Sequence, residues 1–337
     1  MGVDAGVVCG CCCLVVSTYN WAMPAAPAPA PASLIIGCGY LGRRLLPRLL
    51  AQGHTERVYA TTRSPDRARQ LAAMGARPLL VQVTQPLTLA ALTPALDEPS
   101  LDVYHMVPPG RPNQHPSPRQ VVLGGIGHVI KSLRRANLRR AMLVSSTAVY
   151  GYTDGRLVSA ETPVKPSDGR SRIIHEGDQL FLDAGENHHV VRMAGLYGPN
   201  RIVGLAPLTR RAPLLGNPDA LLNLIHVDDA AELLLAVAAA EAPGRVEIGC
   251  DGHPVPRRQY YADLARMLNV EPPDVLDDEA AAARFGLDVE RLRRTASKAL
   301  DNIATCQRTG WSPRYPSYHE GLAQALAESG PGRSQAR

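Results

Sequence analysis

Short apolar runs alternate with longer amphipathic stretches along much of this 337-residue chain. The short runs predict buried β-strands, and the longer stretches, whose apolar residues recur at helical spacing, predict α-helices. The predicted strands cover residues 34–36, 57–63, 78–83, 101–107 and 141–145, and the predicted helices cover residues 43–52, 66–74, 87–96 and 121–136. Strands and helices that alternate at this length form parallel βαβ units with right-handed crossovers. The sequence therefore predicts an α/β fold built on a doubly wound parallel sheet.

The first predicted strand ends in the segment Gly37-Cys38-Gly39-Tyr40-Leu41-Gly42. In a dinucleotide site the first glycine allows a tight turn, the second lets the backbone approach a pyrophosphate, and the third lets the helix pack closely on the strand. Tyr40 and Leu41 stand at the helix start, where backbone N–H groups meet phosphate charge. Ordinary glycine-rich turns can show the same spacing. Here a strand precedes the turn, a helix follows it and a second strand comes next, which favours a Rossmann-type nucleotide site.

The end of the second predicted strand bears on the choice of cofactor. An NAD site usually places Asp or Glu there to accept a hydrogen bond from the ribose 2′-hydroxyl, whereas this chain has Thr62 and Arg63. A guanidinium can pair with a 2′-phosphate, so we expect NADP, with NAD the less favoured cofactor. The alternative is that Arg63 is a solvated loop charge. Gln82 or Thr84 ends the third strand near the expected adenine edge, and Pro108 follows the fourth strand at the ligand-binding edge of the sheet.

Composition excludes several other classes of protein. The formal net charge is +5, but only three lysines are present and no basic run is interleaved with aromatic residues, so we expect no nucleic-acid partner. No uninterrupted apolar stretch reaches the length of a membrane span. Four of the seven cysteines lie within the first 13 residues, and Cys38, Cys250 and Cys306 are scattered. This spacing predicts no metal site, and the scattered thiols suit a reduced, cytoplasmic protein.

Both ends of the sequence are expected to lie outside the folded part. Residues 1–32 contain a Pro/Ala alternation and are interpreted as a disordered or misassigned extension, with Met23 as the expected biological start. Residues 330–337 are expected to form a disordered tail.

Three further segments follow the glycine turn in order: 145–151 (SSTAVYG), 191–199 (VRMAGLYGP) and 224–231 (LIHVDDAA). Together with that turn they resemble the atypical extended short-chain dehydrogenase/reductases, which belong to the NAD(P)-dependent epimerase/dehydratase family and include nucleoside-diphosphate-sugar epimerase-like proteins. The segment 309–318 resembles the closing part of such proteins. The resemblance implies a Rossmann domain over residues 33–195 and a smaller C-terminal substrate-binding part over residues 196–329, interleaved with the core. It also implies a ligand cleft between the two, and it is compatible with a homodimer formed through helices 121–136 and 171–183.

The same resemblance implies positions for the catalytic groups. Ser146 holds the place of the hydroxyl that hydrogen-bonds the reacting oxygen. Alignment through Glu176 puts Asp168 and Arg172 where the family has the tyrosine and lysine of its Tyr-x-x-x-Lys pair. Arg172 could still donate to the nicotinamide ribose, but an ordinary Asp is ionised at neutral pH and would be a base rather than a proton donor. Tyr152 is a candidate substitute for the missing tyrosine.

The second half of the chain is predicted in less detail. Residues 246–249 predict a strand, 258–268 a helix and 279–300 a polar helical stretch. Asp228 and Asp229 are expected to cap a helix over residues 230–240, and His226 is expected to be a structural hydrogen-bonding residue. Arg201 lies where related enzymes meet the distal part of a substrate, although a solvated surface position is an equally good interpretation.

Two functions from different classes fit these observations. The first is an NADP-dependent oxidoreductase, or an epimerase- or dehydratase-like enzyme, that acts by hydride transfer on a carbonyl, hydroxyl or nucleotide-sugar substrate. The second is a catalytically degenerate NADP-binding regulator or scaffold, suggested by the departures at Asp168 and Arg172. Because a purely structural relative has no need of Ser146, its presence favours the enzyme. The expected partner is a small molecule, and the sequence does not choose among reduction, epimerisation and dehydration.

Overall fold

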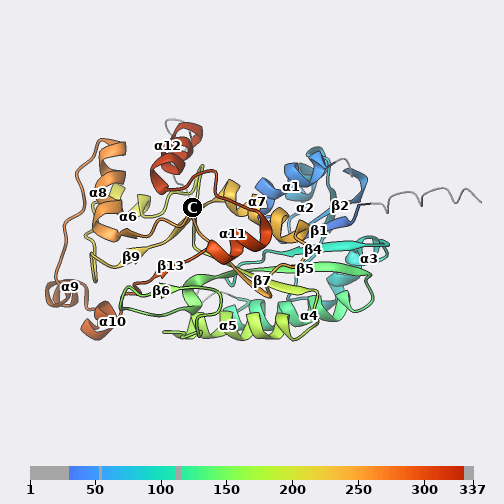
Figure 1. The fold of residues 1–337 in the computed structure, drawn as a ribbon, viewed down its shortest axis with the longest axis horizontal. Coiled ribbons are helices and arrows are strands. Elements are labelled where there is room, and N and C mark those ends of the chain that lie inside the picture. The colour runs from blue at the N-terminus through green and yellow to red at the C-terminus, as the bar shows by residue number, and fades with distance from the viewer. Residues whose placement is uncertain (1–29, 53–54, 111–114, 330–337) are drawn as a thin grey trace, which may run out of the picture. The chain divides into compact units, whose positions relative to one another are not determined.

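Seven parallel strands form the central sheet of the computed structural model, which describes residues 30–52, 55–110 and 115–329 (Figure 1). Their order is β3-β2-β1-β4-β5-β7-β11. The strands are β1 (Ala32–Ile36), β2 (Val58–Thr62), β3 (Arg77–Leu80), β4 (Leu101–His105), β5 (Leu138–Ser146), β7 (His188–Met193) and β11 (Val246–Gly249). The strand order reverses its direction between β1 and β4, and the carboxyl ends of such strands form the ligand-binding crevice of doubly wound sheets. The predicted fold class is therefore confirmed.

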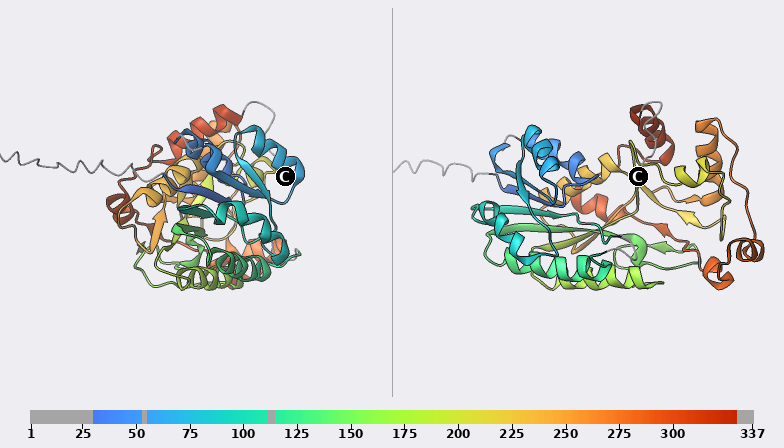
Figure 2. Two further views of the ribbon diagram at one scale, coloured as in Figure 1. Left: turned by 90° about the vertical axis from the view of Figure 1, so that its right-hand side faces the viewer. Right: turned by 180° about the vertical axis from the view of Figure 1, so that it is seen from behind.

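Helices cover both faces of this sheet, so its central strands are apolar on both sides. Every residue of β1 is buried. Ile35 packs in one apolar layer, whereas Leu34 and Ile36 pack in the other. Figure 2 shows the two layers, with the blue helices near the N-terminus on one side of the sheet and the green helices on the other.

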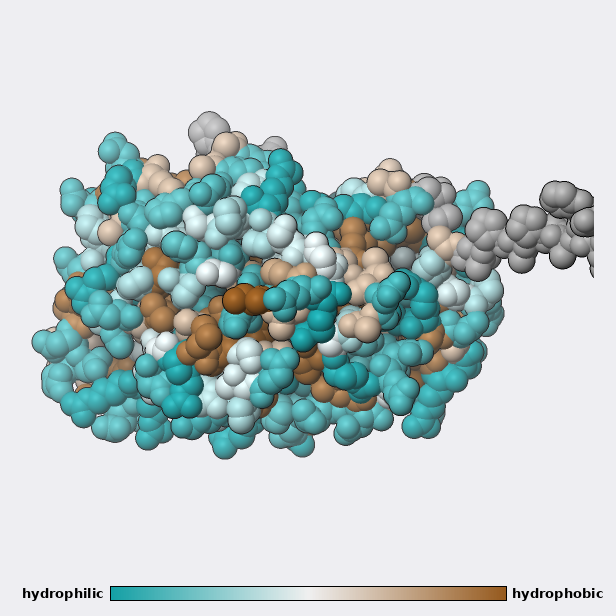
Figure 3. All heavy atoms as spheres, in the orientation of Figure 1, coloured by the Kyte–Doolittle hydropathy of each residue, from teal (hydrophilic) through white to brown (hydrophobic). Residues whose placement is uncertain are grey.

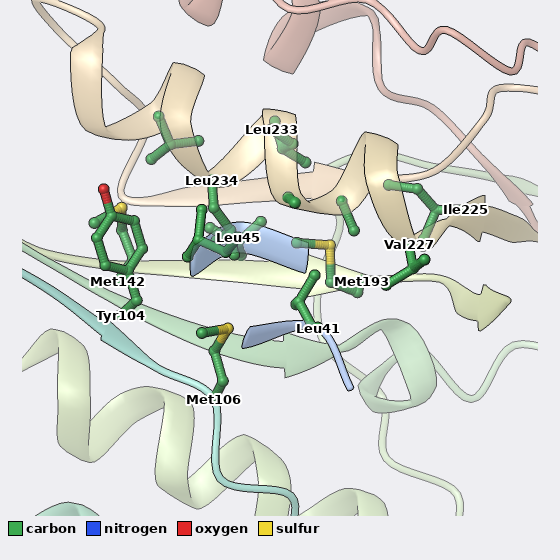
Figure 4. Packing of buried hydrophobic residues seen from close by; sticks show 14 of the residues in the cluster. Leu41, Leu45, Tyr104, Met106, Met142, Met193, Ile225, Val227, Leu233 and Leu234 are labelled. Carbon is green, nitrogen blue, oxygen red and sulfur yellow. The ribbon is translucent and has the colours of Figure 1, made fainter. Parts of the chain in front are cut away.

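The first layer contains four helices: α1 (Gly42–Ala51), α2 (Pro65–Ala73), α7 (Val227–Ala239) and α11 (Ile303–Thr309). Leu45 of α1 and Leu233 and Leu234 of α7 pack against sheet residues that include Met142 and Met193 (Figure 4). This layer joins the N-terminal βα unit to α7, which lies far away in the sequence.

The second layer is built from consecutive segments between β3 and β7. They are the 3-10 helix η2 (Pro86–Leu92), α3 (Thr93–Leu96), the π-helical turn η3 (Gln120–Gly124), α4 (Gly125–Leu133) and α5 (Gly169–Leu182). Gly177 lets α5 lie close to η3, because a Cβ atom at that position would be 2.5 Å from Cγ1 of Val122. Two further short 3-10 turns are η1 (Thr55–Arg57) and η4 (Thr147–Val149).

The C-terminal part adds small sheets and a third apolar cluster. The paired strands are β8 (Gly195–Tyr197) with β10 (Leu224–His226), β9 (Leu221–Leu222) with β12 (Val255–Pro256), and β6 (Leu157–Val158) with β13 (Ala299–Leu300). The remaining helices are α6 (Leu205–Thr209), α8 (Arg257–Leu268), α9 (Asp278–Phe285), α10 (Val289–Arg293) and α12 (Tyr318–Ser329). Tyr197, Tyr260 and Tyr318 are fully buried in the cluster.

The described residues from Pro31 onward form one compact unit. The division into a domain over 33–195 and a substrate-binding part over 196–329 stays a prediction. Hydrophilic residues cover most of the face shown in Figure 3. In the part of the chain that the structure describes, no helix is both long enough and apolar enough to cross a membrane.

The sequence predicted most core elements to within a few residues, and residues 246–249 are strand β11 as expected. The expected continuous helix over 279–300 is wrong. Gly286 adopts a left-handed conformation (φ 63°) that ends α9, and the segment then continues through α10 to strand β13. The expectations for residues 1–29 and 330–337 lie outside the described residues.

The start of α7 also differs from the expectation. His226, rather than Asp228 or Asp229, is the N-cap, because its Nδ1 accepts a hydrogen bond from the Asp228 amide at 3.2 Å. Its structural role was expected, and its Nε2 lies 3.0 Å from Oε1 of Gln324. The buried Asp229 instead accepts the backbone N–H groups of Arg314 and Tyr315, at 2.9 and 3.0 Å. This carboxylate therefore fixes the segment that leads into α12.

We expect Asp229→Ala to lower the free energy of unfolding by about 2–3 kcal/mol, because two backbone N–H groups would lose a buried, charged acceptor. Chemical denaturation followed by circular dichroism measures this change. Glu232→Gln is the matched control, since Glu232 is exposed and pairs with Arg48 at the surface. This substitution should cost less than about 0.5 kcal/mol. Equal stability of the Asp229→Ala variant and the wild type would contradict the assigned role.

Candidate functional site

The turn between β1 and α1 has the geometry that a pyrophosphate cradle requires. Gly37 has φ +86°, and a Cβ atom there would lie 2.8 Å from Cγ2 of Val107. At Gly42 a Cβ atom would lie 3.3 Å from Cγ2 of Ile35, so α1 packs tightly on the strand. At Gly39 the nearest atom would be the Gly37 carbonyl oxygen at 3.9 Å, which leaves open space beside the backbone. The three glycines thus have the local geometry that the expected roles require, and their contact with a pyrophosphate stays a prediction.

Hydrogen bonds hold this turn in place. The Gly37 N–H donates to Oγ1 of Thr61 at 2.9 Å, and the Cys38 N–H donates to the Thr61 carbonyl at 3.1 Å. Within the described residues, the N–H groups of Tyr40 and Leu41 have no protein acceptor. Together with the start of α1 they are donors available for an anion.

A pocket runs from this turn across the carboxyl ends of β4, β5 and β7 to helix α5. The residues that line it are Gly37, Gly39, Tyr40, Leu41, Gly42, His105, Met106, Val107, Pro108, Pro109, Val121, Val122, Ile126, Leu143, Val144, Ser145, Ser146, Ala148, Arg170, Ile174, Asp178, Met193, Ala194, Gly195, Leu196 and Arg201. The structure therefore brings the predicted glycine-turn residues, Pro108 and Ser146 to one pocket. That they bind a cofactor or substrate stays a prediction.

Ser146 ends β5 and begins the turn η4. Its Oγ accepts the Ala148 N–H at 3.2 Å, which fixes the side chain at the pocket wall. The hydroxyl hydrogen has no protein acceptor in the described part of the chain, so it can donate to an oxygen atom in the pocket.

The structure does not bring the predicted pair, Asp168 and Arg172, to the pocket. Asp168 is the N-cap of α5, where its Oδ1 accepts the Ser171 N–H at 2.7 Å and its own N–H donates to Oγ of Ser171. These contacts, the Ser171 amide first, lower the pKa of Asp168. Arg172 is exposed and does not line the pocket; Arg170 and Ile174 lie there instead.

A buried ion pair explains which residues of α5 face the pocket. Asp178, one turn beyond Ile174, is fully buried, and its Oδ2 accepts from Nε of Arg192 at 2.9 Å. Burial raises the pKa of Asp178, an effect that Arg192 opposes. Glu176, which was used to align the helix, is exposed and pairs with Arg119 at 3.0 Å. The signal missed in the sequence is that a buried arginine on strand β7 requires an acidic partner on the inner face of α5.

Tyr152 does not substitute for the missing tyrosine. Its hydroxyl donates to the Pro163 carbonyl at 2.8 Å, its ring lies under the Arg156 guanidinium, and it does not line the pocket. Tyr150 is fully buried and its hydroxyl accepts from Nη1 of Arg192 at 2.6 Å, which gives it a structural position.

The residues expected at the adenosine end lie beyond the pocket lining. Thr62 is buried at the end of β2, and Arg63, which follows it, is exposed and has no ion-pair partner among the described residues. Gln82 donates from its side chain to Oγ1 of Thr84 at 3.2 Å. Their contacts with a cofactor stay a prediction. No group of three or more His, Cys, Asp or Glu within the described ranges is arranged to hold a metal ion.

Comparisons with known proteins agree on the family and the fold. A model of the NAD dependent epimerase/dehydratase family matches residues 33–249. Protein YeeZ of Escherichia coli (strain K12) is 25% identical over 284 residues, which cover 84% of this chain and 95% of YeeZ. A 4-hydroxy-2-methyl-3-oxo-4-farnesyl-3,4-dihydroquinoline-1-oxide ketoreductase of Stigmatella aurantiaca is 30% identical over 250 residues, 70% of this chain and 72% of that protein.

The structure titled MoeE5 in complex with UDP-glucose and NAD shares the fold, with a TM-score of 0.70. It is 20% identical and covers 88% of this chain and 98% of its own.

We expect Gly39→Ala to weaken binding of NADPH by about tenfold or more, because the new methyl group would occupy the open space beside the turn. The free energy of unfolding should change by less than about 0.5 kcal/mol, since that methyl group meets no close protein atom. Gly42→Ala is the comparison variant and should be destabilised by about 1 kcal/mol or more through overpacking. Calorimetric titration and chemical denaturation measure the two effects. Wild-type NADPH affinity in Gly39→Ala would show that this turn does not hold the cofactor.

Proposed function

Because the chain belongs to the NAD-dependent epimerase/dehydratase family, we propose that it is an NADP(H)-dependent oxidoreductase that reduces the carbonyl group of a small molecule. The observation that carries this proposal is the single pocket that joins the glycine turn to Ser146. Similarity to a ketoreductase supports reduction as the reaction. A nucleotide sugar stays a second substrate class, because MoeE5 is described in complex with UDP-glucose.

Each end of the pocket contributes a different part of the proposed mechanism. The open backbone at Gly39 and the free N–H groups of Tyr40 and Leu41 would hold the pyrophosphate. When bound, the nicotinamide group supplies or accepts the hydride. Ser146 would donate a hydrogen bond to the substrate oxygen and stabilise the negative charge that develops there. Ile174 carries no ionisable group, so this chain would not draw its proton from a tyrosine–lysine pair.

Three arginines support NADP over NAD. Arg63 follows β2 directly, and Arg43 and Arg67 act electrostatically on the Cys38 thiol, whose pKa burial raises to about 11. All three therefore lie around the glycine turn or the adjoining strand end. In the described residues none of them forms an ion pair, and the nearby Asp66 is paired with Arg69. A 2′-phosphate would find several guanidinium donors and no adjacent unpaired carboxylate.

A second function is favoured by one observation. The positions on α5 that face the pocket hold Arg170 and Ile174 rather than a tyrosine and a lysine. A protein that binds NADP as a regulator or scaffold would have no need of the proton-transfer pair. We favour the enzyme because Ser146 still presents a free hydroxyl to the same pocket.

We also propose a cytoplasmic location for this activity. Cys38, Cys250 and Cys306 are free thiols in the structure, as expected of a reducing compartment. A homodimer through α4 and α5 stays a prediction.

We expect the wild type to bind NADPH more tightly than NADH. Arg63→Gln should weaken NADPH binding by about tenfold and change NADH binding by less than about twofold, because only NADPH has the 2′-phosphate. Calorimetric titration measures both affinities. Arg134→Gln, an exposed arginine on the far end of α4 without an ion pair in the described residues, is the matched control. A preference for NADH would contradict the proposed cofactor.

We expect Ser146→Ala to lower kcat/KM for carbonyl reduction by about 100-fold while the Kd for NADPH stays unchanged, because the variant loses one hydrogen-bond donor to the reacting oxygen. Oxidation of NADPH against a panel of aldehydes and ketones, followed at 340 nm, measures turnover. NADPH binding without turnover of any carbonyl substrate by the wild type would favour the regulator.

A further inference from the structure

Arg170 stands on one side of the pocket mouth, in the first turn of α5. Its Nη1 donates to the Gly110 carbonyl at 2.8 Å, which anchors the exposed side chain beside the end of β4. A guanidinium has five N–H donors, so this one contact leaves several of them available. Asp168 is the neighbouring carboxylate, but its Oδ1 already accepts from the backbone and side chain of Ser171.

Arg201 lines the same pocket from the C-terminal part of the chain. Gly198 and Arg201 exchange two backbone hydrogen bonds of 3.0 Å, and Asn200 between them is left-handed (φ 63°). The Asn200 N–H donates to Oγ of Ser329, and the Tyr40 hydroxyl donates to the Pro199 carbonyl. The Arg201 guanidinium lies 5.4 Å from the centre of the Tyr40 ring. The backbone that carries Arg201 is therefore fixed from two sides.

The unpaired charge in the pocket lining is positive. Among the described residues neither Arg170 nor Arg201 forms an ion pair, and the carboxylate that lines the pocket, Asp178, is paired with Arg192. His105 does not change this balance, because burial lowers its pKa to about 4 and keeps it neutral near pH 7. Two guanidinium groups are thus available to an anion at the mouth.

The rest of the pocket lining is mostly apolar. It includes Met106, Val107, Pro109, Val144, Ile174 and Leu196. A sugar ring placed against such walls would lose water from several hydroxyl groups without gaining hydrogen-bond partners, which is costly. An aromatic or aliphatic body would instead gain from burial of its apolar surface.

We propose that the pocket selects substrates with an apolar body and one anionic end, a carboxylate or a phosphate, and that Arg170 and Arg201 bind that end. This inference rests on the proposed function in one respect, which is that Ser146 binds the other, uncharged end of the substrate. Arginine suits this recognition because its planar fork matches the oxygens of both anions. The two arginines come from segments far apart in the sequence, α5 and the turn after β8, and both line the same pocket.

The test compares three probes that share an aldehyde on a benzene ring: 4-formylbenzoate, its neutral analogue 4-formylbenzamide, and 4-formylphenyl phosphate. Calorimetric titration measures their affinities for the full chain, with saturating NADP⁺ and without it. The oxidised cofactor prevents reduction of the probes during the titration. The variants are Arg170→Gln, Arg201→Gln and the double variant, and Arg134→Gln is the matched exposed control. Thermal unfolding checks that each variant folds as the wild type does.

We expect the wild type to bind 4-formylbenzoate about tenfold more tightly than 4-formylbenzamide, because hydrogen bonds to a charged acceptor are the stronger ones. Each single variant should reduce this ratio by about threefold, the double variant should bring it close to one, and Arg134→Gln should leave it unchanged. If the phosphate probe binds more tightly than the benzoate, the anionic end of the substrate is a phosphate. If the benzoate binds more tightly, that end is a carboxylate.

Two results would overturn the inference. One is the absence of an effect of the two arginines on the preference for benzoate over benzamide: either the wild type binds both probes equally, or the double variant keeps the preference. The other is a loss of NADP⁺ affinity in the double variant as large as its loss of benzoate affinity, which would assign the two arginines to the cofactor. Failure of the proposed function is distinguishable from both, because the probe ratio can be measured without cofactor and without turnover.

Discussion

The close contact between the glycine turn and the end of β4 is the constraint on which the rest of the site depends. Gly37 adopts a left-handed conformation with Val107 packed directly against it, and Gly42 brings α1 onto the strand. Side chains at these positions would push α1 away from the sheet and close the space beside Gly39. Because β1 and β4 are neighbours at the switch point, this single contact places the turn, Pro108 and the wall formed by β5 around one pocket.

A second constraint sets the opposite wall. The buried pair of Asp178 and Arg192 is the interaction that fixes how α5 is rotated against the sheet. Removing either partner would leave an uncompensated buried charge, so the rotation is strongly specified. Its consequence is that residues 170 and 174 face the pocket. The chain thus has the fold of its family, and the face of α5 toward the pocket presents a guanidinium and an aliphatic side chain.

These side chains bear on the kind of chemistry that the pocket can support. Ser146 has a hydroxyl held by the Ala148 N–H, and the Arg170 guanidinium lines the same pocket. Positive charge at the mouth and apolar walls inside favour a ligand whose two ends differ in polarity. Specificity would then come from the orientation of that ligand as much as from the individual contacts.

The sequence by itself determined the strand–helix alternation, the parallel sheet and the glycine turn between β1 and α1, because these depend on local periodicity and on backbone freedom at single residues. It also indicated Ser146 and the arginine after β2. It could not determine the rotation of α5. Glu176 and Asp178 both carry a carboxylate, and only burial in the folded protein distinguishes them. Likewise, the sequence suggested Asp229 as a helix cap, whereas its carboxylate accepts from Arg314 and Tyr315 far along the chain. Tertiary structure alone decided these positions, because contacts between residues far apart in the chain choose which face of each element meets the pocket.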